Sequence, residues 1–309
     1  MTNKPQNIAL ILIQAATVAV FAGRAWQHLF WDAPFRTLLW DEGWMKGIVK
    51  GVFGMQWQNY ITSMEVDSAI QSAIKGTGVF YLFCALLALF IRKLPKWLGK
   101  VLLLGALSLL ILAALYCKEK FFSLGQFFEY ALQVSSPVFL YQMVYRKVDR
   151  ERLVFYMKVA TALTFICHGL YAINFYPRPG LFVEMFINTL GTKEETAHTL
   201  LAAAGILDFV ASAALFLPLR YARPAALYMA LWGLATALAR ITSFFDASYA
   251  LESMNQWMHE TVFRFPHFLI PLAMWYLMGI LSKRKEEVFY STTTSCLLPA
   301  NRPSFSKRR

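Results

Sequence analysis

Several ionisable side chains of this 309-residue chain lie inside long apolar stretches, where polar chemistry is rare. A charge at the centre of a bilayer costs roughly 2.5–3.5 kcal/mol on insertion scales, so such a residue needs a partner or a function. Histidine exchanges protons near neutral pH, and carboxylates and arginines pair with each other or hold polar ligands. The candidates for ligand binding in the second half are His168, Asp208, Arg240, Glu260, Arg264 and His267.

Helical spacing groups these candidates. Residues three or four positions apart share one helix face, as Thr164 and His168 do, and Thr236 and Arg240. The spacing predicts one polar cluster in the second half, near the outer ends of its helices. A thinner secondary cluster is expected in the first half from Arg24, His28, Lys75 and Glu129.

Two interpretations of the main cluster stay open. Ion pairs and hydrogen bonds can hold together helices that have no hydrophobic drive between them. Alternatively, the cluster lines an outward cavity that binds a quinone, a polar lipid head group or another small molecule. A proton relay through His168, Asp208 and His267 would suit quinone redox chemistry or proton-coupled transport.

Other chemistries have less support. The five histidines form no H-x-x-x-H or H-E-x-x-H pair, so no metal site is expected, and haem is not expected either. The four cysteines form no C-x-x-C pair. A Gly-rich phosphate loop, a Ser-His-Asp arrangement and a nucleic-acid module are not apparent, and no nucleic-acid partner is expected.

The composition indicates the class of fold that positions these residues. Apolar residues make up 58% of the chain and charged residues 16%, with a mean hydropathy of +0.45. These values exclude a soluble enzyme, a disordered chain and a disulfide scaffold. Runs of about 20 apolar residues, the length of a spanning helix, recur along the chain. We expect an all-α polytopic membrane bundle with eight transmembrane helices at about 8–29, 70–91, 100–117, 126–145, 153–174, 198–218, 224–243 and 261–282.

Charge patterning predicts the orientation. Lys and Arg number 30 against 18 Asp and Glu, and the basic residues concentrate in short alternate connections. The positive-inside rule then places these connections and both termini in the cytoplasm. The basic connections are 92–100, 146–152, 220–223 and 283–285.

The two halves share an order of elements, which predicts two parallel four-helix repeats. The segment that starts at Gly78 aligns with the one that starts at Gly205. The expected domains are residues 1–150, with a long outer loop at 30–69 that forms short interfacial helices, and residues 151–285. Residues 286–309 are expected to be a disordered basic cytoplasmic tail.

The second half carries an "HG…P.PG" segment and an "AGILD…A..LF" helix, at His168–Gly180 and Ala204–Phe216. In these motifs the chain resembles the DoxX/DoxD-like membrane proteins, and more distantly the membrane part of vitamin-K-dependent carboxylase-type proteins. The resemblance implies a bacterial inner membrane and a redox-linked or small-molecule-binding subunit. The alternative it implies is a non-catalytic assembly factor or cargo-binding protein with a membrane-protein partner.

Overall fold

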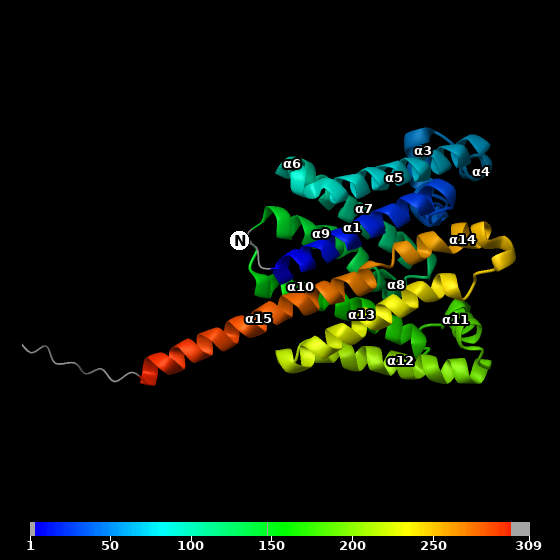
Figure 1. Ribbon diagram of the computed structural model, residues 1–309. Coiled ribbons are helices and arrows are strands. Elements are labelled where there is room, and N and C mark those ends of the chain that lie inside the picture. Colours follow the sequence, from blue (N-terminus) through cyan, green and yellow to red (C-terminus); the bar gives the residue numbers. More distant parts are fainter. Residues whose placement is uncertain (1–3, 147, 298–309) are drawn as a thin grey trace, which may run out of the picture.

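The computed structural model describes residues 4–146 and 148–297, and every regular element in this part of the chain is a helix (Figure 1). In chain order the helices are α1 (Lys4–Phe30), α2 (Arg36–Leu39), α3 (Glu42–Phe53), α4 (Trp57–Thr62), α5 (Met64–Phe90), η1 (Ile91–Lys93), α6 (Lys96–Gly99), α7 (Val101–Glu119), α8 (Leu124–Glu129), α9 (Ala131–Tyr145), α10 (Arg150–Ala172), α11 (Gly180–Leu190), α12 (Glu194–Ala214), α13 (Leu219–Thr242), η2 (Ala247–Tyr249), α14 (Ala250–Val262) and α15 (Pro266–Leu297).

Long apolar helices dominate the bundle. A lipid bilayer offers the backbone no hydrogen-bond partner, so a spanning segment must satisfy its own backbone groups as a helix. Within the described residues, seven segments are long and apolar enough to cross a membrane, and the chain is a multi-pass membrane protein. They are Pro5–Phe30, Met64–Lys93, Lys96–Glu119, Arg150–Ala172, Glu194–Ala214, Leu219–Thr242 and Ala247–Ser282.

The helix predicted at 126–145 is not continuous, and it is absent from those seven segments. Tyr130 separates α8 from α9, with φ −82° and ψ 0°. The Thr164 hydroxyl of α10 accepts a hydrogen bond from the Leu132 backbone N–H at 3.2 Å, which satisfies one donor freed at the break. The polar residue pattern of this stretch predicted a spanning helix but not its interruption.

Together, α8 and α9 still connect the two ends of the bundle. At one end, the hydroxyl groups of Ser123 and Tyr171 lie 3.0 Å apart. At the other end, the Tyr145 hydroxyl donates to the carbonyl oxygens of Ile91 and Leu94, at 2.9 and 2.8 Å. The α8–α9 pair therefore reaches from the end of α10 at one side to the end of α5 at the other.

The helix predicted at 261–282 is also interrupted. Residues 263–265 form tight turns between α14 and α15, in which the Phe265 N–H donates to the Val262 carbonyl at 3.1 Å. Pro266 then begins α15. Proline has no N–H to donate and favours the first turn of a helix, so Pro266 is well suited to begin α15 at this position.

The expectation of a disordered tail from residue 286 is wrong as far as Leu297, because α15 continues to that residue. No Gly or Pro interrupts the sequence from Ile280 to Leu297, and Lys, Arg and Glu all have high helix propensity. The rest of the expected tail, 298–309, lies outside the described residues.

Short helices gather at the end of the bundle away from the N-terminus, where Figure 1 shows α3, α4, α11 and α14. We call this the far end. The short helices expected within 30–69 are present as α2, α3 and α4. Among the long helices, α1 packs on α5, α9, α14 and α15, and α10 packs on α8, α9, α12 and α15. The first helix of each half thus contacts the interrupted helix of the other half.

Candidate functional site

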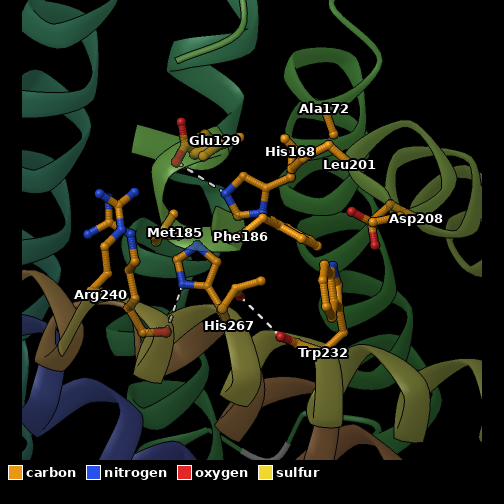
Figure 2. A pocket seen from close by; sticks show the side chains of 14 residues that line it. Glu129, His168, Ala172, Met185, Phe186, Leu201, Asp208, Trp232, Arg240 and His267 are labelled. Carbon is orange, nitrogen blue, oxygen red and sulfur yellow. Dashed lines mark hydrogen bonds and ion pairs between the residues drawn. The ribbon is translucent and has the colours of Figure 1, made fainter. Parts of the chain in front are cut away.

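A cavity lies between α8, α10, α11, α12, α13 and the start of α15, and Figure 2 shows its wall from close by. The volume inside it that the centres of water molecules can occupy is about 70 Å³. Five of the six predicted candidates line it together with Glu129 from the secondary cluster: His168, Asp208, Arg240, Arg264 and His267.

Two stacked histidines form the centre of the polar wall. The His168 and His267 rings lie 5.3 Å apart between centroids, with 18° between their planes. His168 Nε2 lies 3.1 Å from Glu129 Oε1, at the last residue of α8. A carboxylate that orients an imidazole is the arrangement that proton transfer uses in many sites. The break after α8 supplies this carboxylate to a histidine of the other half.

The second histidine has an unpaired ring nitrogen. His267 Nδ1 lies 2.8 Å from the Arg264 carbonyl oxygen, which can only accept, so Nδ1 carries the proton. His267 Nε2 has no hydrogen-bond partner among the described residues, and the side chain is only 3% exposed. A buried polar atom without a partner costs about 1–3 kcal/mol.

The two arginines of the cavity share one carboxylate. Glu260 Oε2 lies 3.0 Å from a guanidinium nitrogen of Arg240 and 3.0 Å from one of Arg264. Glu260 itself does not line the cavity, and it pairs with two arginines that do. This predicted candidate therefore supports the site rather than facing it.

Asp208 lies across the cavity from the histidines, beside the Trp232 ring (Figure 2). Its side chain is buried, and Tyr228 donates a long hydrogen bond of 3.4 Å to Oδ1. This length exceeds the 2.5–3.0 Å usual for such a bond. The α12 helix brings Asp208 here because α10 and α12 touch backbone to backbone at Gly169 and Gly205.

Arg24 lies in a separate buried cluster of polar and aromatic side chains and does not line the cavity. It is fully buried in α1, where Gln133 Oε1 accepts from Nε at 3.1 Å and from a terminal nitrogen at 2.7 Å. Its guanidinium carbon lies 3.8 Å from the Phe263 ring centre and 4.9 Å from the Tyr130 ring centre. Cation–π contacts of this kind stabilise a buried arginine that has no carboxylate beside it.

The remaining members of the secondary cluster separate. The His28 ring lies against Tyr81 at 5.1 Å, and its Nδ1 is 2.7 Å from the Arg24 carbonyl. Lys75 is exposed on α5 and takes no part in either group. The first half of the chain thus supplies one residue, Glu129, to the cavity.

The apolar residues that line the cavity were not among the predicted site residues. They come from Ala172, Phe182, Met185, Phe186, Leu201, Ala204 and Trp232. Ala172, Ala204 and Trp232 could have been found from spacing, because each lies one helical turn from His168, Asp208 or Thr236. The α11 residues come from a loop in our prediction, which gave no reason to place them at the site.

Metal ligands do not come together in the described part of the chain. No group of three His, Cys, Asp or Glu side chains there is arranged to hold a metal ion. Cys84, Cys117 and Cys167 are buried and form no disulfide.

The chain was compared with protein-family models, with curated proteins and with solved structures, and nothing matched in any of the three comparisons.

Proposed function

We propose that this membrane protein binds a quinone or another lipid-like small molecule in the cavity between α10, α12, α13 and α15, as a redox-linked or small-molecule-binding subunit. The observation that carries the proposal is the composition of the wall. Histidine and carboxylate groups lie beside aromatic and aliphatic side chains, within helices of membrane length. Ligand sites commonly combine mostly apolar walls with a few polar groups that fix orientation.

The proposal includes the arrangement in the membrane. We place eight passes in the bilayer, as two parallel DoxX-like repeats, with both termini in the cytoplasm of a bacterial cell. The reach of α8 and α9 between the two ends supports an eighth pass. The matching neighbours of α1 and α10 support a repeat. The basic connections support the orientation.

Native mass spectrometry of protein extracted in mild detergent, with an absorption spectrum of the same sample, tests the binding function. We expect a bound organic molecule of stoichiometric amount. His168→Ala should reduce its occupancy at least tenfold while the thermal melt stays cooperative, because the imidazole faces the cavity. His198→Ala is the matched control, since His198 is a half-exposed surface residue that does not line the cavity.

An apo mass for the wild type would contradict the proposal, and a lower melting temperature for His168→Ala would then show that the polar cluster stabilises the fold. The ion pairs and hydrogen bonds of the polar cluster would then serve only to hold the helices together.

A second candidate function is a non-catalytic assembly or cargo-binding protein. The exposed apolar face of α3 favours it, because Trp44, Ile48 and Val52 recur every four residues and are 60%, 48% and 72% exposed. A partner that co-purifies with the wild type and is lost on Trp44→Ala, with the cavity ligand unchanged, would support this function.

A further inference from the structure

An apolar groove continues from the cavity between α11 and α13. It is lined only by residues of these two helices: Met185, Phe186, Thr189, Leu190, Trp232, Ala235, Thr236 and Ala239. Met185, Phe186, Trp232 and Thr236 also line the cavity, so the two spaces share a wall. The volume inside the groove that the centres of water molecules can occupy is about 190 Å³.

The groove reaches the side of the bundle that would contact lipid. Ala235 lines it and is itself exposed, and its neighbours on the same face of α13, Leu231 and Leu238, are 61% and 43% exposed. Exposed leucines on a membrane-length helix face hydrocarbon. The groove therefore provides an apolar path from the bilayer to the polar cavity.

The α11 helix covers this path and is held at one end. The Ser243 hydroxyl group lies 2.7 Å from the Thr189 hydroxyl, and the Asn188 amide donates to the Ser243 carbonyl at 3.1 Å. The groove itself lies between apolar side chains of the two helices. The Met185 carbonyl also accepts from the Ser243 hydroxyl at 3.3 Å, so the hydrogen bonds between the two helices all go to Ser243, and the walls can separate around an alkyl chain on the side away from it.

The charges around the cavity describe the head group. Three carboxylates, Glu129, Asp208 and Glu260, stand against two arginines, and both arginines already pair with Glu260. With the histidines neutral, three carboxylates against two arginines leave a formal charge of −1 around the cavity, which disfavours an anionic head group. Asp208 has only the neutral side chains of Tyr228 and Trp232 as hydrogen-bond partners, and a carboxylate has further acceptor positions, so it favours a head group that donates a hydrogen bond.

From these observations we infer that the cavity and the groove form one two-part site for a single-chain amphiphile with an uncharged, hydroxyl-bearing head. The head binds beside Asp208 and the chain lies between α11 and α13, where it enters from the bilayer. This inference rests on the proposed binding function and adds the entry route and the class of head group.

Photo-crosslinking tests it with two probes of identical diazirine-bearing dodecyl chains, one ending in a hydroxyl and one in a sulfate. The full-length protein in nanodiscs is labelled, and the attachment sites are read by peptide mass spectrometry. We expect the alcohol to label α11 and α13 residues of the groove at least tenfold more than the sulfate does. Asp208→Asn should reduce this preference.

Ala235→Phe tests the path itself, because a phenyl ring at this position fills the groove without touching the polar wall. We expect groove labelling by the alcohol to fall at least fivefold. Leu231→Phe is the control, since Leu231 is on the same helix but outside the groove, and it should leave labelling unchanged.

The possible outcomes distinguish a failure of this inference from a failure of the proposed binding function. Equal labelling by both probes overturns the head-group assignment, while labelling of cavity residues without groove residues overturns the entry route. In both cases ligand binding in the cavity still stands. The absence of labelling in both spaces, with no endogenous ligand in the native mass spectrum, overturns the binding function as well.

Discussion

At the scale of single residues, the sequence predicted which side chains are polar and buried better than it predicted their partners. His168, Asp208, Arg240, Arg264 and His267 line one cavity, as helical spacing indicated. Glu129 was assigned to the other group, because sequence position says nothing about which half of a bundle a side chain faces. It pairs with His168, 39 positions further along the chain. Arg24 was grouped with Lys75, but Gln133 and aromatic rings surround it.

The contact between Asp41 and Lys118 gives a residue-scale prediction. Asp41 caps α3 by accepting from the Trp44 N–H at 3.0 Å, and the Lys118 ammonium of α7 donates to its other oxygen. The hydrogen bond from Lys118, followed by the one from Trp44, lowers the pKa of the Asp41 carboxyl below its ordinary value of 3.8. A lowered folded-state pKa contributes stability that is present above the unfolded pKa and lost as pH falls through the folded pKa.

Asp41→Asn keeps a cap acceptor but removes the charge. Thermal melts from pH 3 to 7 should therefore show a wild-type advantage that is constant above about pH 5 and shrinks as the pH falls below the ordinary aspartate pKa. Glu42→Gln serves as the control, because the Glu42–Lys46 pair is more than half exposed and should contribute little at any pH. An advantage that grows on acidification would rule out this account.

At the scale of elements, apolar length predicted the long helices well, and local breaks were missed. Hydrophobic periodicity does not report a break that side chains of another helix stabilise, as Thr164 does at Leu132. At the second break, Pro266 was visible in the sequence, but the predicted span ran through it. Both breaks contribute to the polar groups, through Glu129 at one and Arg264 and His267 at the other. The sequence therefore predicted most of the polar residues of the site, but not how the two helix breaks position them.

Gly233 holds the second break in place. A Cβ atom there would lie 2.4 Å from the His267 carbonyl oxygen, which is backbone and cannot rotate away. Gly233→Ala should therefore lower the free energy of unfolding in mixed micelles by about 1–3 kcal/mol and reduce ligand occupancy, because His267 must shift.

Gly76→Ala on α5 is the matched variant, since its Cβ would meet nothing within 4 Å. Higher helix propensity should leave its stability unchanged or raise it by up to about 1 kcal/mol. Equal losses in both variants would mean that the Gly233 contact has no special effect.

At the scale of the whole molecule, composition alone indicated a multi-pass helical membrane protein, and the seven membrane-length segments of the described residues agree. The number of crossings depends on α8 and α9, since an eighth pass puts both termini on one side and seven passes put them on opposite sides.

Single cysteines at Lys120 and Asp149, both exposed, flank this pair and decide the matter. In a Cys296→Ser background, we expect a membrane-impermeant maleimide added to intact cells to label Lys120→Cys and to spare Asp149→Cys until the cells are opened. Labelling of both positions in intact cells would exclude the eighth pass.

The partners that bury Arg24 are synthesised at different times, and this has a consequence for insertion into the membrane. The arginine belongs to α1, while Phe263, which covers its guanidinium, is made 239 residues later. At about 5–20 residues per second this is a delay of roughly 10–50 s. During that interval Arg24 lacks the ring of Phe263, and a buried charge without its full set of partners is costly in a membrane. A chain truncated before Phe263 therefore keeps this charge only partly covered.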